Sequence, residues 1–145
     1  MPAFTSSRRT ALMLGMALGS VHAAIAQDVT NPGDPITPSS GNSPIAEGVA
    51  SAIDNSAATK YLNFDRANTG FTVTPSGASV VTAMTLVTAN DAPERDPSGY
   101  VLEGSTDGVN FSLIAQGMLT LPTARFALAS VTFPNAVPFV HYRVI

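Results

Sequence analysis

The loop over residues 90–97 holds the densest group of side chains that could bind a ligand. Only 12% of the chain is charged, yet five of these eight residues carry an amide or a charge: Asn90, Asp91, Glu94, Arg95 and Asp96. Two prolines stiffen the loop, and Arg and carboxylate groups form bidentate hydrogen bonds with ligand groups or with each other. We therefore predict ligand binding here. A second interpretation stays open, in which Arg95 pairs with Asp91 or Asp96 and only holds the loop together.

A weaker binding set lies earlier in the chain, where Lys60 is followed by the aromatic Tyr61. With Phe64 close by, Tyr61 could offer a flat face on which a ligand stacks. Aromatic residues at such positions more often fill a core, and both interpretations remain open.

The residues offer little for catalysis. The chain has no Cys, which excludes thiolate metal sites, a Cys nucleophile and disulfides. After residue 26, His141 is the only His, so a zinc site or a Ser/His/Asp triad would have to be built around it. Glu94 with Asp96, or either with Glu103, could imitate a glycosidase pair, but nothing in the sequence supplies the cleft. We expect no enzyme.

Net charge excludes another class of partner. Beyond residue 26 the chain carries ten Asp and Glu against five Lys and Arg. A protein that binds nucleic acid neutralises phosphates with an excess of basic residues. We therefore expect no nucleic-acid partner.

Residues 1–26 have the pattern of a signal peptide. Arg8 and Arg9 precede an apolar run over residues 11–21, and Ala24-Ile25-Ala26 provides a small-x-small cleavage site. The run is shorter than the roughly 20 residues that span a bilayer, so we expect cleavage and no membrane span. The segment from Ser7 to Leu12 resembles a twin-arginine signal. This predicts export from a bacterial cytoplasm, to the periplasm or outside.

The rest of the chain divides into a linker and one domain. Residues 27–44 are rich in Pro, Ser, Asn and Gly and show no apolar period, which predicts a linker. Residues 45–145 form the predicted domain, with one or two helical turns over 47–53. Short strands separated by turn signals follow, over residues 71–74, 80–89, 100–103, 111–115, 131–133 and 139–145. This spacing is typical of an all-β fold, an antiparallel β-sandwich or jelly roll.

Three segments carry a resemblance to a known family. The hairpin YVLEGSTDGVNFSLIA (100–115) resembles the strand-turn-strand signature of discoidin-like domains, also called coagulation-factor C-type domains. AIDNSAATKY (52–61) and FVHYRV (139–144) are similar to two further segments of that family, in the same order. The family belongs to the galactose-binding-like superfamily, which includes family 32 carbohydrate-binding modules. Together the matches run from about residue 47 to residue 145, which is most of the chain beyond residue 26.

The resemblance also implies a calcium site. A turn that exposes carbonyls beside a carboxylate and a hydroxyl supplies the oxygen ligands that Ca²⁺ prefers. In many relatives this loop holds structural Ca²⁺, which implies Asp54, Thr59 and the carbonyl near Ser56 as ligands. Relatives also use a Glu from a final strand, and the domain is expected to lack that strand because the sequence stops at Ile145. The alternative is that Asp54 and Thr59 only cap the turn.

The resemblance thus implies a non-catalytic module that recognises carbohydrate or a cell-surface polymer through loops at one end of the sandwich. A structural or adhesive module that binds protein or lipid is the alternative.

Overall fold

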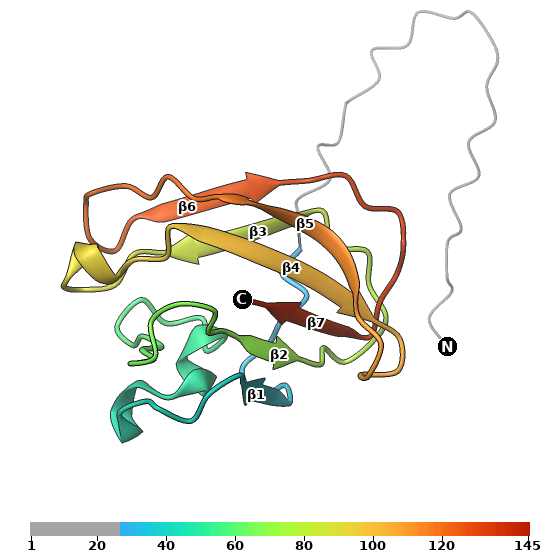
Figure 1. Cartoon of the computed structure of the whole chain (residues 1–145), viewed down its shortest axis with the longest axis horizontal. Coiled ribbons are helices and arrows are strands. Elements are labelled where there is room, and N and C mark those ends of the chain that lie inside the picture. The colour runs from blue at the N-terminus through green and yellow to red at the C-terminus, as the bar shows by residue number, and fades with distance from the viewer. Residues whose placement is uncertain (1–26) are drawn as a thin grey trace, which may run out of the picture.

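The structure is a computed structural model and describes residues 27–145, so the predicted signal peptide lies outside the described residues. Its strands form two antiparallel sheets (Figure 1). The larger sheet has the order β1-β2-β7-β4-β5, and the smaller pairs β3 with β6. Their bounds are β1 Ile36–Pro38, β2 Phe71–Val73, β3 Ala83–Val87, β4 Gly99–Ser105, β5 Ser112–Met118, β6 Leu128–Thr132 and β7 His141–Val144. This β-sandwich confirms the predicted fold class.

Strand β4 illustrates why these segments form strands. Leu102 and Gly104 are buried, and they alternate with the half-buried Val101 and Glu103. This period of two places one set of side chains against the core and the other on the outer face. All six predicted strands overlap an observed one.

Strand β1 lies within the segment that the sequence predicts as a linker. Ile36 pairs with Val73 of β2, and the carboxylate of Asp65 accepts hydrogen bonds from the side chains of Ser40 and Asn42. Residues 36–42 are therefore attached to the larger sheet. A strand of three residues that ends in a proline gives no alternation, which is why its sequence reads as a linker.

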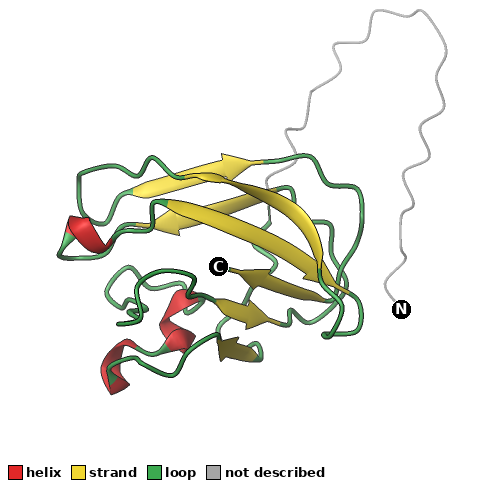
Figure 2. Cartoon of the chain, in the orientation of Figure 1, coloured by secondary structure: helices red, strands yellow, loops and turns green. Residues whose placement is uncertain are grey.

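The helices are short and gather at one end of the sandwich, which we call the helical end (Figure 2). They are the 3₁₀ helices η1 (Ile45–Glu47), η2 (Val49–Ala52) and η3 (Pro93–Arg95). Helix η2 lies within the helical turns predicted over residues 47–53, and η1 meets that range only at Glu47. No helix within residues 27–145 has the length and apolar character needed to cross a membrane.

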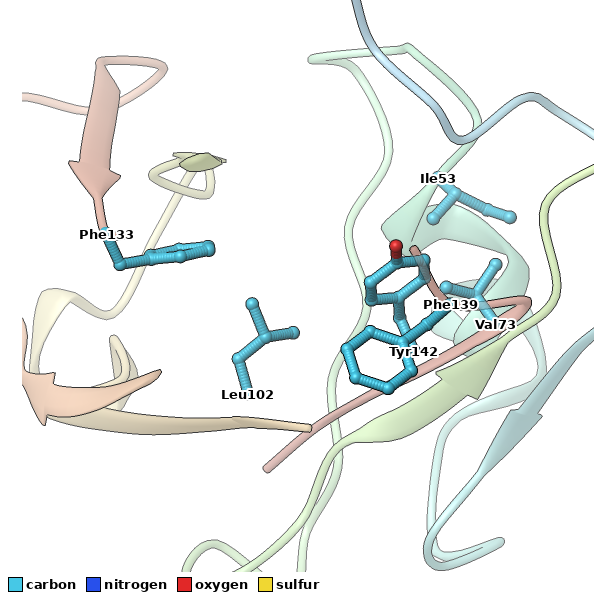
Figure 3. Packing of buried hydrophobic residues seen from close by; sticks show 6 residues of the cluster. All are labelled: Ile53, Val73, Leu102, Phe133, Phe139 and Tyr142. Atoms are coloured by element: carbon cyan, nitrogen blue, oxygen red, sulfur yellow. The ribbon is translucent and has the colours of Figure 1, made fainter. Parts of the chain in front are cut away.

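The core lies between the sheets (Figure 3). Its buried side chains are Ile53, Val73, Leu102, Phe133, Phe139 and Tyr142. The rings of Phe139 and Tyr142 pack edge to face, with centroids 6.2 Å apart. Phe139 also lies directly over Gly104, where a Cβ would come within 2.3 Å of the ring. Only glycine fits beneath this ring.

The hairpin between β4 and β5 lies at the opposite end. The Asp107 carboxylate accepts hydrogen bonds from the backbone N–H of Val109 and Asn110, from the Asn110 side chain and from the Ser105 hydroxyl. Gly108 has φ +74°, the positive value predicted for this turn. These bonds, led by that of the Asn110 side chain, hold the pKa of Asp107 well below its ordinary value.

Because the pKa of Asp107 is lowered in the folded state, we expect the protein to lose stability in acid. A carboxyl with a lowered pKa in the folded state stabilises the fold above its unfolded pKa of about 3.9, and this contribution is lost as pH falls below that value. We expect Asp107→Asn to lower the melting temperature at pH 6 and to flatten its decline below pH 4. Asn110→Ala should flatten the same decline, because it removes the largest cause of the shift. Melting curves at several pH values test this, and an unchanged acid slope in both variants would refute it.

Candidate functional site

A pocket of about 460 Å³ opens at the helical end. It is lined by Ala46, Glu47, Ala58, Thr59, Lys60, Asn90 and Phe126. These residues come from helix η1, from the loop after η2, from the loop after β3 and from the loop before β6. Segments far apart in the sequence therefore meet around one concave surface.

Lys60 ties three of these segments together. Its Nζ lies 2.7 Å from Asp91 Oδ1, 3.0 Å from Asn90 Oδ1 and 3.4 Å from Glu47 Oε1. The hydrogen bond to Asp91 raises the pKa of Lys60 and lowers that of Asp91, so both groups stay charged over the neutral range. The side chain of Lys60 is only 15% exposed. The lining of the pocket thus includes an ammonium group that is held by contacts with Asp91, Asn90 and Glu47.

Phe126 supplies an aromatic wall that the sequence analysis missed. Its side chain is exposed, and its backbone N–H donates to Thr88 O at 2.9 Å. No local sequence pattern indicated this residue, because its position follows from the pairing of β3 with β6. Because Val87 pairs with Leu128, Phe126 must lie beside the residues that follow β3.

The residues of the loop over 90–97, which we call the charged loop, have different surroundings in the structure. Asn90 lines the pocket and Asp91 holds Lys60. Arg95 contacts Asp91 at 3.1 Å, which is the pairing of the second interpretation. Asp96 pairs instead with Arg125, which the sequence analysis did not single out. Glu94 is exposed on η3, outside the lining; ligand binding by these residues stays a prediction.

Tyr61 packs on the larger sheet. Its ring lies edge-on to Phe71, with centroids 6.2 Å apart, and its hydroxyl donates to Gly70 O at 3.3 Å. Tyr61 is half-buried and is not among the side chains packed against the buried core, so its part in ligand binding stays a prediction. Phe64 is exposed, but neither Phe64 nor Tyr61 lines the pocket.

The loop of the implied calcium site brings its three oxygens together. Thr59 Oγ1 donates to Asp54 Oδ2 at 2.6 Å and lies 3.1 Å from Ser56 O. Ser56 N–H donates to Asp54 Oδ1 at 2.9 Å, which is the bond of a capped turn. Among residues 27–145, no three His, Cys, Asp or Glu side chains cluster as metal ligands. These oxygens are donor types that Ca²⁺ prefers, but three of them with a single carboxylate are fewer than the roughly six to eight that the ion takes, so the calcium site stays a prediction.

Solved structures share this fold, although no family model and no curated protein sequence matches the chain. One is a family 32 carbohydrate-binding module from Clostridium perfringens in complex with GalNAc-beta-1,3-galactose, with TM-score 0.60, 18% identity, and coverage of 75% of this chain and 81% of the other. The fold is therefore similar to that of family 32 carbohydrate-binding modules. The resemblance read from the three sequence segments is confirmed at the level of the fold.

Two further solved structures share this fold. The family 32 module of NanJ from Clostridium perfringens, in complex with galactose, has TM-score 0.57 and 16% identity and covers 75% of this chain and 80% of the other. A chitosan-binding module from Paenibacillus sp. IK-5, in complex with chitotriose, has TM-score 0.60 and 15% identity and covers 81% and 85%.

Proposed function

We propose that this protein is an exported, non-catalytic module that binds carbohydrate or a cell-surface polymer at the helical end. The observation that carries the proposal is the pocket that places the exposed ring of Phe126 beside Lys60, Asn90 and Glu47. A sugar presents C–H groups that pack on an aromatic ring and hydroxyls that need polar partners. The structures with this fold that contain galactose, GalNAc-beta-1,3-galactose or chitotriose support the same class of ligand.

The pairing of the carboxylates supports a role without catalysis. Asp91 is held by Lys60, Asp96 by Arg125 and Glu103 by Arg143, the last at 2.6 Å. A general acid needs a pKa raised toward neutrality, whereas Lys60 lowers the pKa of Asp91. Of the three carboxylates considered from the sequence as glycosidase-like pairs, Asp96 and Glu103 are therefore engaged in ion pairs, and Glu94 is exposed on η3. Export is supported by the signal pattern of residues 1–26.

A glycan array with the purified protein tests the proposal. We expect binding to a restricted group of glycans. Binding to immobilised protein or lipid in the absence of any glycan signal would favour the structural or adhesive alternative.

Calcium forms a second part of the proposal, in which Asp54, Thr59 and the Ser56 carbonyl hold the ion. We expect Ca²⁺ to raise the melting temperature and a chelator to lower it, because a ligand bound only by the folded state adds about 2.7 kcal/mol at 100 times its Kd. Asp54→Asn should abolish the difference, and Asp34→Asn, which removes an equal charge elsewhere, should keep it. A melting temperature of the unaltered protein that is the same with calcium and with chelator would refute the calcium site.

A further inference from the structure

Arg125 directly precedes Phe126, and its guanidinium is held by the neighbouring loop. It donates to both carboxylate oxygens of Asp96, at 3.0 and 2.6 Å, and to Pro122 O at 3.3 Å. Its contact with Asp91 O is 3.5 Å long. The Arg125 and Asp96 side chains are 18% and 17% exposed. We call this ion pair the clasp.

The clasp is better placed to fix geometry than an ordinary surface ion pair. Exposed pairs contribute little because water screens them and their side chains remain mobile. A bidentate Arg-carboxylate pair fixes two planar groups relative to each other, and here both are largely shielded from solvent. Since Asp96 follows η3, the clasp joins the loop before β6 to the loop that carries Asn90 and Asp91.

Phe126 needs such support because its backbone is strained. Its φ of +58° lies in the left-handed region, which bulky residues seldom adopt and which persists only when the surroundings fix it. Thr88, which is 3% exposed, supports the turn from beneath. Its hydroxyl donates to Ala124 O at 2.8 Å and accepts from Ala127 N–H at 2.9 Å. The clasp holds the same turn from the side of the charged loop.

We propose that Arg125, held by Asp96, is a positioning residue that fixes the ring of Phe126 as the wall of the pocket without touching the ligand. Arg125 does not line the pocket, so its influence on affinity passes through Phe126. The inference rests on the proposed function, in that the pocket is the place where carbohydrate binds.

A fluorescence experiment tests the positioning step without any ligand. The chain has no Trp, so Phe126→Trp introduces a single reporter into the pocket wall. Adding Arg125→Gln should lower the anisotropy of this reporter and raise its quenching by acrylamide about twofold. Phe64→Trp is the matched reporter, because Phe64 and Phe126 are both 55% exposed, and Arg125→Gln should leave it unchanged. An unchanged reporter at position 126 would overturn the proposal.

A double-mutant cycle tests the link to binding. With a glycan identified on the array, Arg125→Gln should weaken affinity about five- to tenfold alone, and hardly further in the Phe126→Ala background. Losses that multiply would overturn the proposal, because Arg125 would then act independently of the ring. Asp96→Asn should reproduce the loss, and it serves as the second variant if Arg125→Gln fails to fold in a thermal melt. Absence of glycan binding by the unaltered protein would refute the proposed function, while the fluorescence result would still decide the positioning role.

Discussion

Phe126→Ala is expected to weaken glycan binding about thirtyfold. An aromatic ring that a bound ligand covers, and that acts as a hot spot, contributes about 2 kcal/mol or more, and each 1.4 kcal/mol is a factor of about ten in Kd. Phe126 is the one aromatic residue in the lining of the pocket, so its removal leaves no ring on which a sugar can stack. Calorimetric titration of the strongest glycan from the array measures the change.

Phe64→Ala is the matched control for that experiment, since it deletes the same ring from an equally exposed position outside the lining. Its affinity should stay within about twofold of the unaltered protein, because surface changes away from a site have little effect. Equal losses of affinity in both variants, or no loss in Phe126→Ala, would show that the glycan does not bind in this pocket.

Phe139→Ala is expected to lower the free energy of unfolding by about 3–5 kcal/mol. Removing a buried phenyl ring costs its transfer free energy and leaves a cavity. Phe139 packs on Tyr142 and covers Gly104, so the cavity would open beside β4 and β7 (Figure 3). Chemical denaturation measures the change, and Phe64→Ala should shift the same curve by less than about 0.5 kcal/mol.

Gly104→Ala provides the complementary test of this packing. Alone it should cost about 1–3 kcal/mol, because its Cβ would lie 2.3 Å from Phe139 Cδ2. In the Phe139→Ala background the cost should shrink, since the three atoms nearest to that Cβ all belong to the ring. Additive costs would show that the two residues do not share this contact.

Much of the fold was predictable because local patterns carried it. The alternation of buried and half-buried side chains in β4 and the positive φ at Gly108 each follow from a few consecutive residues. Strand β1 was not predictable in this way. It is held by its pairing with β2 and by Asp65, far along the chain, and three residues cannot display a period of two.

The candidate site was predicted only in part, because its residues meet through the pairing of distant segments. The sequence indicated Lys60 and Asp91 separately, yet their contact joins positions 31 residues apart. The sequence predicted an ion pair of Arg95 with Asp91 or Asp96. In the structure Arg95 pairs with Asp91, and Asp96 pairs with Arg125. That choice depends on how β6 pairs with β3, which composition and periodicity do not determine.

The backbone strain at Phe126 has a counterpart at Ala92 in the charged loop, where φ is +45°. Each such residue costs roughly 1–3 kcal/mol of folding free energy. At Phe126 a glycine would relieve that cost and remove the ring together. Under the proposed function, stability and ligand binding therefore oppose each other at this position.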